Sequence, residues 1–151
     1  MGMKSCFFIG HREASEEIYP VLHAAVEQHI VEYGVTEFIV GHYSGFDRLA
    51  ASAVKEAKRF YPEVKLTLLL PYHPEERPTP TQDGFDSTFY PPGMESVPRK
   101  IAIVRANRYV VDHVDYLIAY AWHPASNARK LVVYAKKCEI RDLISIYNLR
   151  D

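Results

Sequence analysis

Short apolar runs alternate along the chain with longer stretches of amphipathic pattern. Five of the runs are nearly continuous in apolar residues, which is typical of parallel strands that are covered on both faces. They predict strands at 5–10, 37–41, 65–71, 116–122 and 142–149.

The stretches between the runs predict four helices. After the first run, apolar residues recur at three- and four-residue steps up to Tyr33, and Gly34 supplies a C-terminal stop. Pro20 fits a helix only in its first turn, so this helix is expected to begin near Tyr19 rather than at Ser15. The other helical patterns cover 47–60, 98–112 and 126–137.

Strands separated by helices of this length form successive βαβ units with right-handed crossovers. The pattern therefore predicts an α/β fold, a Rossmann-like three-layer αβα domain with a mostly parallel sheet of about five strands. With 151 residues and 48% hydrophobic composition, the chain is expected to form a single domain over 1–151. Ligands of such sheets bind at the carboxyl ends of the strands, near the point where the strand order reverses.

The segment 71–98 departs from this regular pattern. It holds seven of the ten prolines, shows no clear periodicity and carries five acidic residues against one arginine. We expect an irregular Pro-rich insertion that forms a partly ordered flap over the strand ends. Its aromatic residues favour docking on the domain over full disorder. They are Tyr72, Phe85, Phe89 and Tyr90.

Charge and cysteine content exclude several function classes. The formal net charge of -1 gives no overall field that would attract nucleic acid or an anionic membrane, so an anion site must be local. The two cysteines, Cys6 and Cys138, exclude a disulfide scaffold and a zinc finger. No apolar stretch approaches the length of a membrane span or secretory signal, so a cytoplasmic location is expected.

The loop after the first strand carries Gly10, His11 and Arg12. Glycine at a strand end lets the backbone approach a ligand closely, and the imidazole and guanidinium can bind phosphate or stack on a base. An equally good alternative is a tight turn at Gly10 followed by two solvated side chains.

The loop after the second strand opens directly into a helix and contains Gly41, Ser44, Gly45 and Asp47. Two glycines at such a turn are expected to leave backbone N–H groups of the helix N-terminus free for an anion. The spacing matches neither G-x-G-x-x-G nor a Walker A sequence. Asp47 is either the helix N-cap or an acceptor for a ribose hydroxyl.

Two further loops complete the predicted cleft. In the third helix, Arg105 and Arg108 are candidates to neutralise a bound anion, although Arg108 could instead snorkel from the apolar stripe. After the fourth strand, Ser126 or Asn127 is a natural N-cap that would leave further N–H groups for an anion. Three helix N-termini are then expected to converge on one cleft, which favours a phosphate-bearing ligand.

Several motifs, taken in order, resemble a known family over nearly the whole chain. They are CFFIGHR at 6–12, GHYSGFD at 41–47 with Ala50-Ala51, LPY at 70–72, RANRYVV at 105–111 and DYLIAY at 115–120. In these motifs the chain is similar to the SLOG superfamily of Smf/DprA and LOG-like Rossmann domains, and in particular to its YpsA-like branch of bacterial proteins. The resemblance implies a Rossmann-like fold.

The resemblance also implies a range of functions. The superfamily contains cytokinin-activating phosphoribohydrolases, the single-stranded DNA binder DprA and domains proposed to sense ligands derived from nucleotides. The phosphoribohydrolases carry a Pro-Gly-Gly-x-Gly-Thr motif and a downstream glutamate, where this chain has PASNAR at 124–129 and no carboxylate before Glu139. An enzyme of that mechanism is therefore not favoured.

Our leading hypothesis is a cytosolic domain that binds or senses a nucleotide or nucleotide derivative, with no required cofactor and with nucleotide, NAD or an ADP-ribose-like molecule as candidate ligands. The alternative is a hydrolase of an N-glycosidic or phosphoester bond of a nucleotide, with His11, His42 or Asp47 as general acid or base. Single-stranded nucleic-acid binding is less favoured, because the chain is nearly neutral and 71–98 is acidic.

The remaining sequence features concern metal binding and assembly. His11, His42 and His123 follow three different strands, but their spacing matches no metal motif, so no metal is expected. Tyr116, Tyr120 and Trp122 alternate along the fourth predicted strand. They are expected to form an exposed aromatic edge, which makes a homodimer a candidate assembly.

Overall fold

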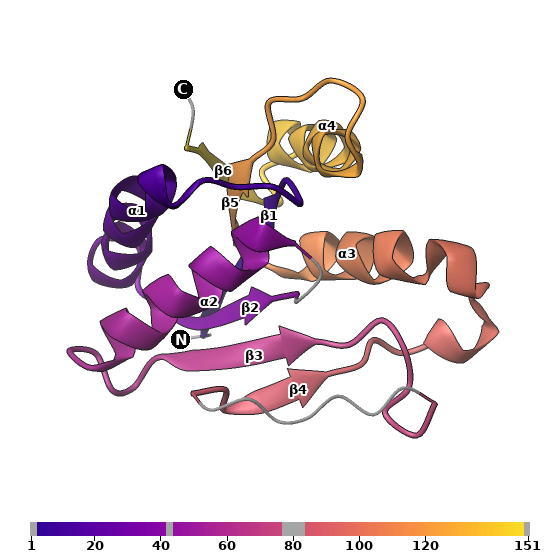
Figure 1. Cartoon of the computed structure of the whole chain (residues 1–151), viewed down its shortest axis with the longest axis horizontal. Helices are drawn as coiled ribbons and strands as arrows, with labels where there is room; N and C mark the ends of the chain where they lie inside the picture. Colours follow the sequence, from indigo (N-terminus) through magenta and orange to yellow (C-terminus); the bar gives the residue numbers. More distant parts are fainter. Residues whose placement is uncertain (1–2, 42–43, 77–83, 150–151) are drawn as a thin grey trace.

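The computed structural model describes residues 3–41, 44–76 and 84–149. Six strands form one all-parallel sheet in the order β4-β3-β2-β1-β5-β6, with β4 and β6 at its two edges (Figure 1). The strands are β1 (Lys4–Gly10), β2 (Val35–Val40), β3 (Lys65–Leu69), β4 (Ser87–Phe89), β5 (Tyr116–Tyr120) and β6 (Ser145–Asn148).

Four α-helices cover the two faces of this sheet. They are α1 (Tyr19–Val31), α2 (Gly45–Lys58), α3 (Ala102–His113) and α4 (Asn127–Ile140), with short 3-10 helices η1 (Glu16–Ile18), η2 (Met94–Ser96) and η3 (Arg99–Ile101). Buried residues of α1 and α2 share one core cluster, and those of α3 and α4 share the other. The predicted three-layer Rossmann-like architecture is therefore confirmed. None of the helices in the described ranges is long and apolar enough to cross a bilayer.

The helix boundaries follow the local signals in the sequence. Pro20 occupies the first turn of α1, which begins at Tyr19 as expected. Gly34 follows the helix with φ +73°, a left-handed conformation that glycine adopts without steric cost. Ser44 and Ser126 are the N-caps of α2 and α4.

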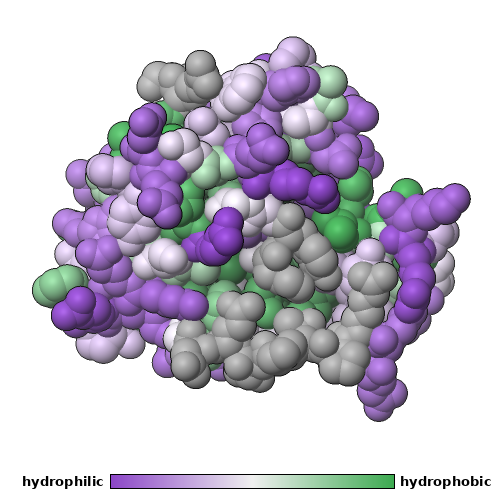
Figure 2. All heavy atoms as spheres, viewed as in Figure 1, coloured by the Kyte–Doolittle hydropathy of each residue, from purple (hydrophilic) through white to green (hydrophobic). Residues whose placement is uncertain are grey.

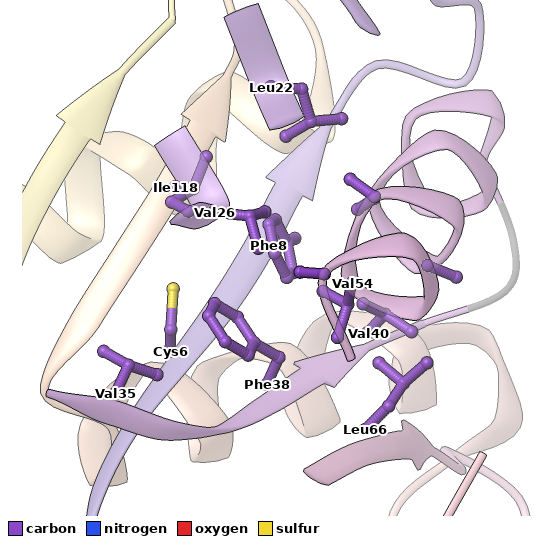
Figure 3. Close-up of a cluster of buried hydrophobic side chains, with 14 of the residues drawn as sticks. Cys6, Phe8, Leu22, Val26, Val35, Phe38, Val40, Val54, Leu66 and Ile118 are labelled. Carbon is purple, nitrogen blue, oxygen red and sulfur yellow. The ribbon is translucent and has the colours of Figure 1, made fainter. Parts of the chain in front are cut away.

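Strand β1 runs through the middle of the sheet and contributes to both core clusters. Cys6 and Phe8 face α1 and α2, while Phe7 and Ile9 face α3 and α4. Figure 3 shows Phe8 between Leu22 and Val26 of α1 and Val54 of α2. Burial on both faces explains why the run is continuously apolar. Burial also raises the pKa of the Cys6 thiol, which is a structural core residue as expected.

The described part of the segment 71–98 contains two elements that the sequence pattern did not predict, strand β4 and the short helix η2. Strand β4 pairs in parallel with β3 and forms a sheet edge, so the sheet has six strands rather than about five. Its sequence, Ser-Thr-Phe, is too short and too polar to give a strand signal. Phe85, Phe89, Tyr90 and Tyr72 pack against the core clusters, as expected of docking aromatic residues.

Asp86 anchors the start of β4. Its Oδ2 accepts hydrogen bonds from the Leu66 backbone N–H at 2.8 Å and from Lys58 Nζ at 2.5 Å. Desolvation alone would raise the pKa of Asp86, but these hydrogen bonds and the nearby charges of Lys58 and Lys65 lower it overall. The edge strand thus depends on a long-range contact with the end of α2.

The prediction of an exposed aromatic edge is wrong. Strand β5 lies between β1 and β6, so its tyrosines face neighbouring helices rather than a free edge. Tyr116 stacks on Tyr33 with ring centroids 5.2 Å apart, and Tyr120 stacks on Phe46 at 5.9 Å. Only Trp122, beyond the strand, is largely exposed. The expected basis for a homodimer is therefore absent from β5.

Candidate functional site

A cleft of about 460 Å³ lies between α3 and α4 at the carboxyl end of β1. The chain runs from β1 through β2, β3 and β4 and then returns to β5 on the other side of β1, so the strand order reverses between β1 and β5. The cleft is lined by residues that follow both of these strands. It therefore occupies the position at which open α/β sheets bind ligands.

Four basic side chains line the cleft, from Arg12, Lys100, Arg108 and Lys130. Asp47 is the one acidic residue among the described lining residues. Lys100 lies in η3. Figure 2 shows a strongly hydrophilic margin at the right of the molecule, where Figure 1 places the segment that leads into α3. The cleft thus carries a local positive charge that the net charge of the chain conceals.

Arg108 is held in place by contacts between α3 and α4. Its guanidinium carbon lies 4.7 Å from the centroid of the Tyr134 ring, in cation–π geometry. The Tyr134 hydroxyl donates to Asp112 Oδ1 at 2.6 Å. This hydrogen bond, with desolvation, raises the pKa of Tyr134 to about 12. Arg108 thus lines the cleft, and its guanidinium group also packs on the Tyr134 ring.

The N-terminus of α4 faces the cleft. Ser126 Oγ accepts from the Arg129 backbone N–H at 3.0 Å and donates to the His123 carbonyl at 2.9 Å. The backbone N–H groups of Asn127 and Ala128 donate no hydrogen bond to any described residue. Both residues line the cleft, so these donors and the positive end of the helix dipole are available to an anion.

The N-terminus of α2 offers no comparable donors. The Gly45 N–H donates to the Arg12 carbonyl at 2.6 Å, the Phe46 N–H to the His11 carbonyl at 3.4 Å and the Asp47 N–H to Ser44 Oγ at 3.0 Å. The prediction that this turn leaves its N–H groups free is therefore wrong. Ser44 rather than Asp47 is the N-cap, so that alternative for Asp47 is also wrong.

The helix N-termini that follow the three predicted loops, those of α1, α2 and α4, do not all reach the cleft. Residues from the first turns of α2 and α4 line it, and so do Ile103 and Val104 from the first turn of α3, whereas no residue of α1 does. The chain after Arg12 first forms η1 and reaches α1 only at Tyr19, which places that helix N-terminus away from the cleft lining. Of the N-termini of α2 and α4, only that of α4 keeps N–H donors available among the described residues.

His11 connects the ends of β1 and β5. Its Nε2 lies 2.8 Å from the Trp122 backbone nitrogen and 3.1 Å from that of His123, and both N–H groups donate to it. Nε2 must therefore be the unprotonated acceptor, which leaves the ring proton on Nδ1. The ring is buried and packs edge-on against Tyr120 and Trp122. His11 thus fixes the backbone beside the cleft as well as lining it.

Asp47 lies where the cleft meets a smaller pocket. This second space has a volume of about 30 Å³ and shares Ile9, Asp47, Ile103 and Asn107 with the cleft. The Asp47 side chain is buried, and a Cβ on Gly41 would lie 2.9 Å from its Oδ2. Gly41 therefore leaves the room that the carboxylate occupies.

The glycines Gly10 and Gly45 permit close approach of protein atoms. A Cβ on Gly10 would lie 2.2 Å from Phe46 Cγ, and one on Gly45 would lie 2.7 Å from the Arg12 carbonyl oxygen. Gly10 lines the cleft with its backbone, but the contact that requires glycine is the one with Phe46.

Most of the predicted site residues come together in the cleft. Arg105 is exposed and lies outside its lining, as do Gly41 and Gly45. His42, a candidate acid or base, falls outside the described residues. The predicted residues in the lining are Gly10, His11, Arg12, Ser44, Asp47, Arg108, Ser126 and Asn127.

Sequence reasoning missed three polar lining residues, Lys100, Asn107 and Lys130. Lys130 lies four residues after the N-cap Ser126, so helical spacing could have placed it on the same side of α4. Asn107 likewise lies four residues after Ile103 on α3. Lys100 precedes α3 and carries no such signal.

The described residues contain no group of three or more His, Cys, Asp or Glu side chains that could hold a metal ion. Comparison with protein-family models and with curated proteins gives no match for this chain. The geometry and charge of the cleft are therefore the main indications of function.

Proposed function

We propose that the cleft binds a phosphate-bearing ligand of the nucleotide class, and that the domain acts as a nucleotide or nucleotide-derivative sensor. The observation that carries this proposal is the meeting of four basic side chains with the available N–H donors of α4 in one cleft. Charge-assisted hydrogen bonds from guanidinium and ammonium groups are the strongest that a protein offers to phosphate oxygens. The resemblance to SLOG domains, some of which are proposed to sense such ligands, agrees with this assignment.

The arrangement suggests a role for each side of the cleft. A phosphate at the N-terminus of α4 would accept from Asn127 and Ala128 and lie near Lys130. Asp47, in the first turn of α2, is suited to accept from a ribose hydroxyl, and Asn107 can both donate to and accept from a base or sugar. NAD and ADP-ribose combine these groups and are candidate ligands.

The experiment is a thermal-shift and calorimetric screen against AMP, ADP, ATP, NAD, ADP-ribose and ribose 5-phosphate. A ligand that binds only the folded protein raises its melting temperature. We expect Arg108→Ala and Lys130→Ala each to weaken binding about tenfold or more, because a hydrogen bond to a charged group contributes about 1.5–3 kcal/mol.

The chain supplies matched controls for both variants. Arg105 lies on α3 one turn before Arg108 but outside the cleft, and Lys136 is exposed on α4. Arg105→Ala and Lys136→Ala should leave the affinity unchanged. Absence of binding across the whole panel, or equal losses in the control variants, would contradict the proposal.

A second candidate function is hydrolysis of the N-glycosidic bond of the same ligand. The observation that favours it is the pocket of about 30 Å³ beside Asp47, which has the volume of about one water molecule. In this reaction the water oxygen bonds to the anomeric carbon as the bond to the base breaks. Asp47 takes the water proton, and the base leaves with the electron pair.

This candidate is separated from sensing by product analysis. Incubation with AMP, NAD or ADP-ribose followed by chromatography should show the released base, and Asp47→Asn should abolish release while ligand binding persists. Binding without any product would leave the sensor proposal and remove hydrolysis.

A further inference from the structure

A row of polar residues crosses the sheet on the face covered by α3 and α4. Ser5 of β1 is in register with Glu37 of β2, and Thr67 of β3 is in register with Ser87 of β4. Their odd-numbered neighbours Phe7, Ile39 and Leu69 are buried on the same face. All-parallel sheets are normally apolar on both faces, so a polar row across four strands is a departure that needs an explanation.

The hydroxyl groups of Ser87 and Thr67 form an oriented chain of hydrogen bonds that ends at Glu37. Thr67 Oγ1 donates to Glu37 Oε2 at 3.0 Å and lies 2.9 Å from Ser87 Oγ. Because the single hydroxyl proton of Thr67 is used toward Glu37, Ser87 must donate to Thr67. Thr67 is only 3% exposed, so its orientation is fixed by packing. No described residue donates to Oε1 of Glu37, which leaves this oxygen as an acceptor.

A groove of about 300 Å³ opens above this row. Its floor includes Ser5, Glu37, Thr67 and Ser87, and its walls are Phe89 and the last turns of α3. That end of α3 leads directly into the start of β5, so the groove lies toward the amino ends of the strands. It shares no lining residue with the cleft at the carboxyl end of β1. The volume is at the lower end of the range for small-molecule sites.

The walls of the groove are aromatic. Tyr109 stacks on His113 with centroids 4.1 Å apart and lies 5.8 Å from the Phe89 ring. The Nδ1 of His113 is 2.6 Å from the Tyr109 carbonyl oxygen, to which it donates. Aromatic side chains of this kind pack against methylene groups and attract cations to their faces.

Glu37 is the one carboxylate among the described residues that line the groove. Lys65 is its register partner on β3 and is a candidate counter-ion. No ion pair within 4.0 Å joins the two side chains in the described part of the chain, and Lys65 is exposed outside the groove lining. Glu37 is thus a half-buried carboxylate that accepts from the Thr67 hydroxyl and forms no ion pair among the described residues.

We infer that this groove is a second binding site, which takes a small protonated aliphatic amine. The ammonium group lies against Glu37 and donates to the hydroxyl oxygens of the polar row, while the methylene chain packs between Phe89 and Tyr109. Charge complementarity carries the choice of ligand, because a phosphate or carboxylate would be repelled by Glu37. Among the described lining residues it meets no basic side chain other than the imidazole of His113.

The test is calorimetric titration of the intact chain with putrescine, a linear diamine, and with 1,4-butanediol, its uncharged counterpart. We expect putrescine to bind and butanediol to fail. Glu37→Gln keeps the size of the side chain and an acceptor for Thr67 but removes the charge, so the affinity for putrescine should fall at least tenfold. Glu63→Gln, a change of an exposed carboxylate outside the groove, should leave the affinity unchanged.

Four outcomes would overturn the inference: no binding of putrescine at millimolar concentration, equal binding of butanediol, unchanged affinity in Glu37→Gln, or an equal loss in Glu63→Gln. The last would indicate a diffuse attraction to surface carboxylates. Lys130→Ala serves as a further variant, since it alters only the cleft and should leave the titration with putrescine unaffected.

Discussion

The contact between Gly10 and Phe46 makes a strong prediction, because it separates two reasons for a glycine at the end of β1. If glycine is needed for the approach of a ligand, Gly10→Ala should spare stability and impair binding. The structure indicates the opposite. A Cβ at this position would lie 2.2 Å from Phe46 Cγ and 2.3 Å from Cδ2, far inside the normal carbon contact of about 3.5–4.0 Å.

The ring has no room to retreat. Phe46 is fully buried and packs on Phe8 with centroids 6.4 Å apart and on Tyr120 at 5.9 Å. Overpacking of a core costs about 1–3 kcal/mol and sometimes more, and the depth of this overlap places Gly10→Ala near the upper end, at about 3 kcal/mol. Phe46→Ala should cost about 4 kcal/mol by leaving a cavity.

A double-mutant cycle tests this reasoning. In Gly10→Ala/Phe46→Ala the added methyl enters the space that the ring has left, so the double variant should be no less stable than Phe46→Ala alone. The two changes are then coupled by about 3 kcal/mol, which is at the top of the range measured for residues in contact. Urea unfolding followed by circular dichroism, with linear extrapolation, supplies each free energy.

Additive losses, or a Gly10→Ala variant within about 1 kcal/mol of the wild type, would refute the steric argument, since a loss that small falls at or below the bottom of the range for overpacking. A stable Gly10→Ala variant with impaired nucleotide binding would restore the ligand explanation for this glycine.

Three further predictions concern single side chains. Burial lowers the pKa of His29, so the unfolded chain takes up a proton first as pH falls below about 6.5. The free energy of unfolding should then fall by up to about 1.4 kcal/mol per pH unit. His29→Phe should flatten this part of the profile of stability against pH, and an unchanged profile would contradict the assignment. Asp142 follows α4 with φ 59°, so Asp142→Gly should raise stability by about 0.5–1 kcal/mol in urea unfolding, whereas a loss would show that the aspartate stabilises the turn. His11→Phe keeps a ring but removes the acceptor for the Trp122 and His123 N–H groups. The free energy of unfolding should fall by about 1–3 kcal/mol, and an unchanged value would mean that solvent replaces Nε2.

Local sequence patterns were sufficient for the main elements of the fold. Continuous apolar runs such as the one through Phe7 and Phe8 require burial on both faces, and helical periodicity between them requires crossovers, so a parallel three-layer sheet follows. Helix ends at Gly34 and Ser126 were also predictable, because a left-handed residue and an N-cap depend on neighbouring backbone atoms alone.

Strand β4 could not be predicted in this way. Its three residues carry no periodicity, and the strand exists because β3 offers a free edge and Asp86 reaches Leu66 and Lys58 across the fold. The same holds for the polar row through Glu37 and Thr67, which is visible only when four strands are set in register.

For the cleft, the order of strands and helices along the chain was enough to predict which loops meet, because the carboxyl ends of parallel strands share one edge of the sheet. The contacts that each residue makes there depend on the packing of the folded chain. The first two N–H groups of α2 donate to the carbonyls of Arg12 and His11, and the imidazole of His11 accepts from two N–H groups of the loop after β5. Hydrogen-bond partners between distant segments depend on how those segments pack. The sequence pattern therefore predicts the candidate residues, and the packing of the fold determines which of them are available to a ligand.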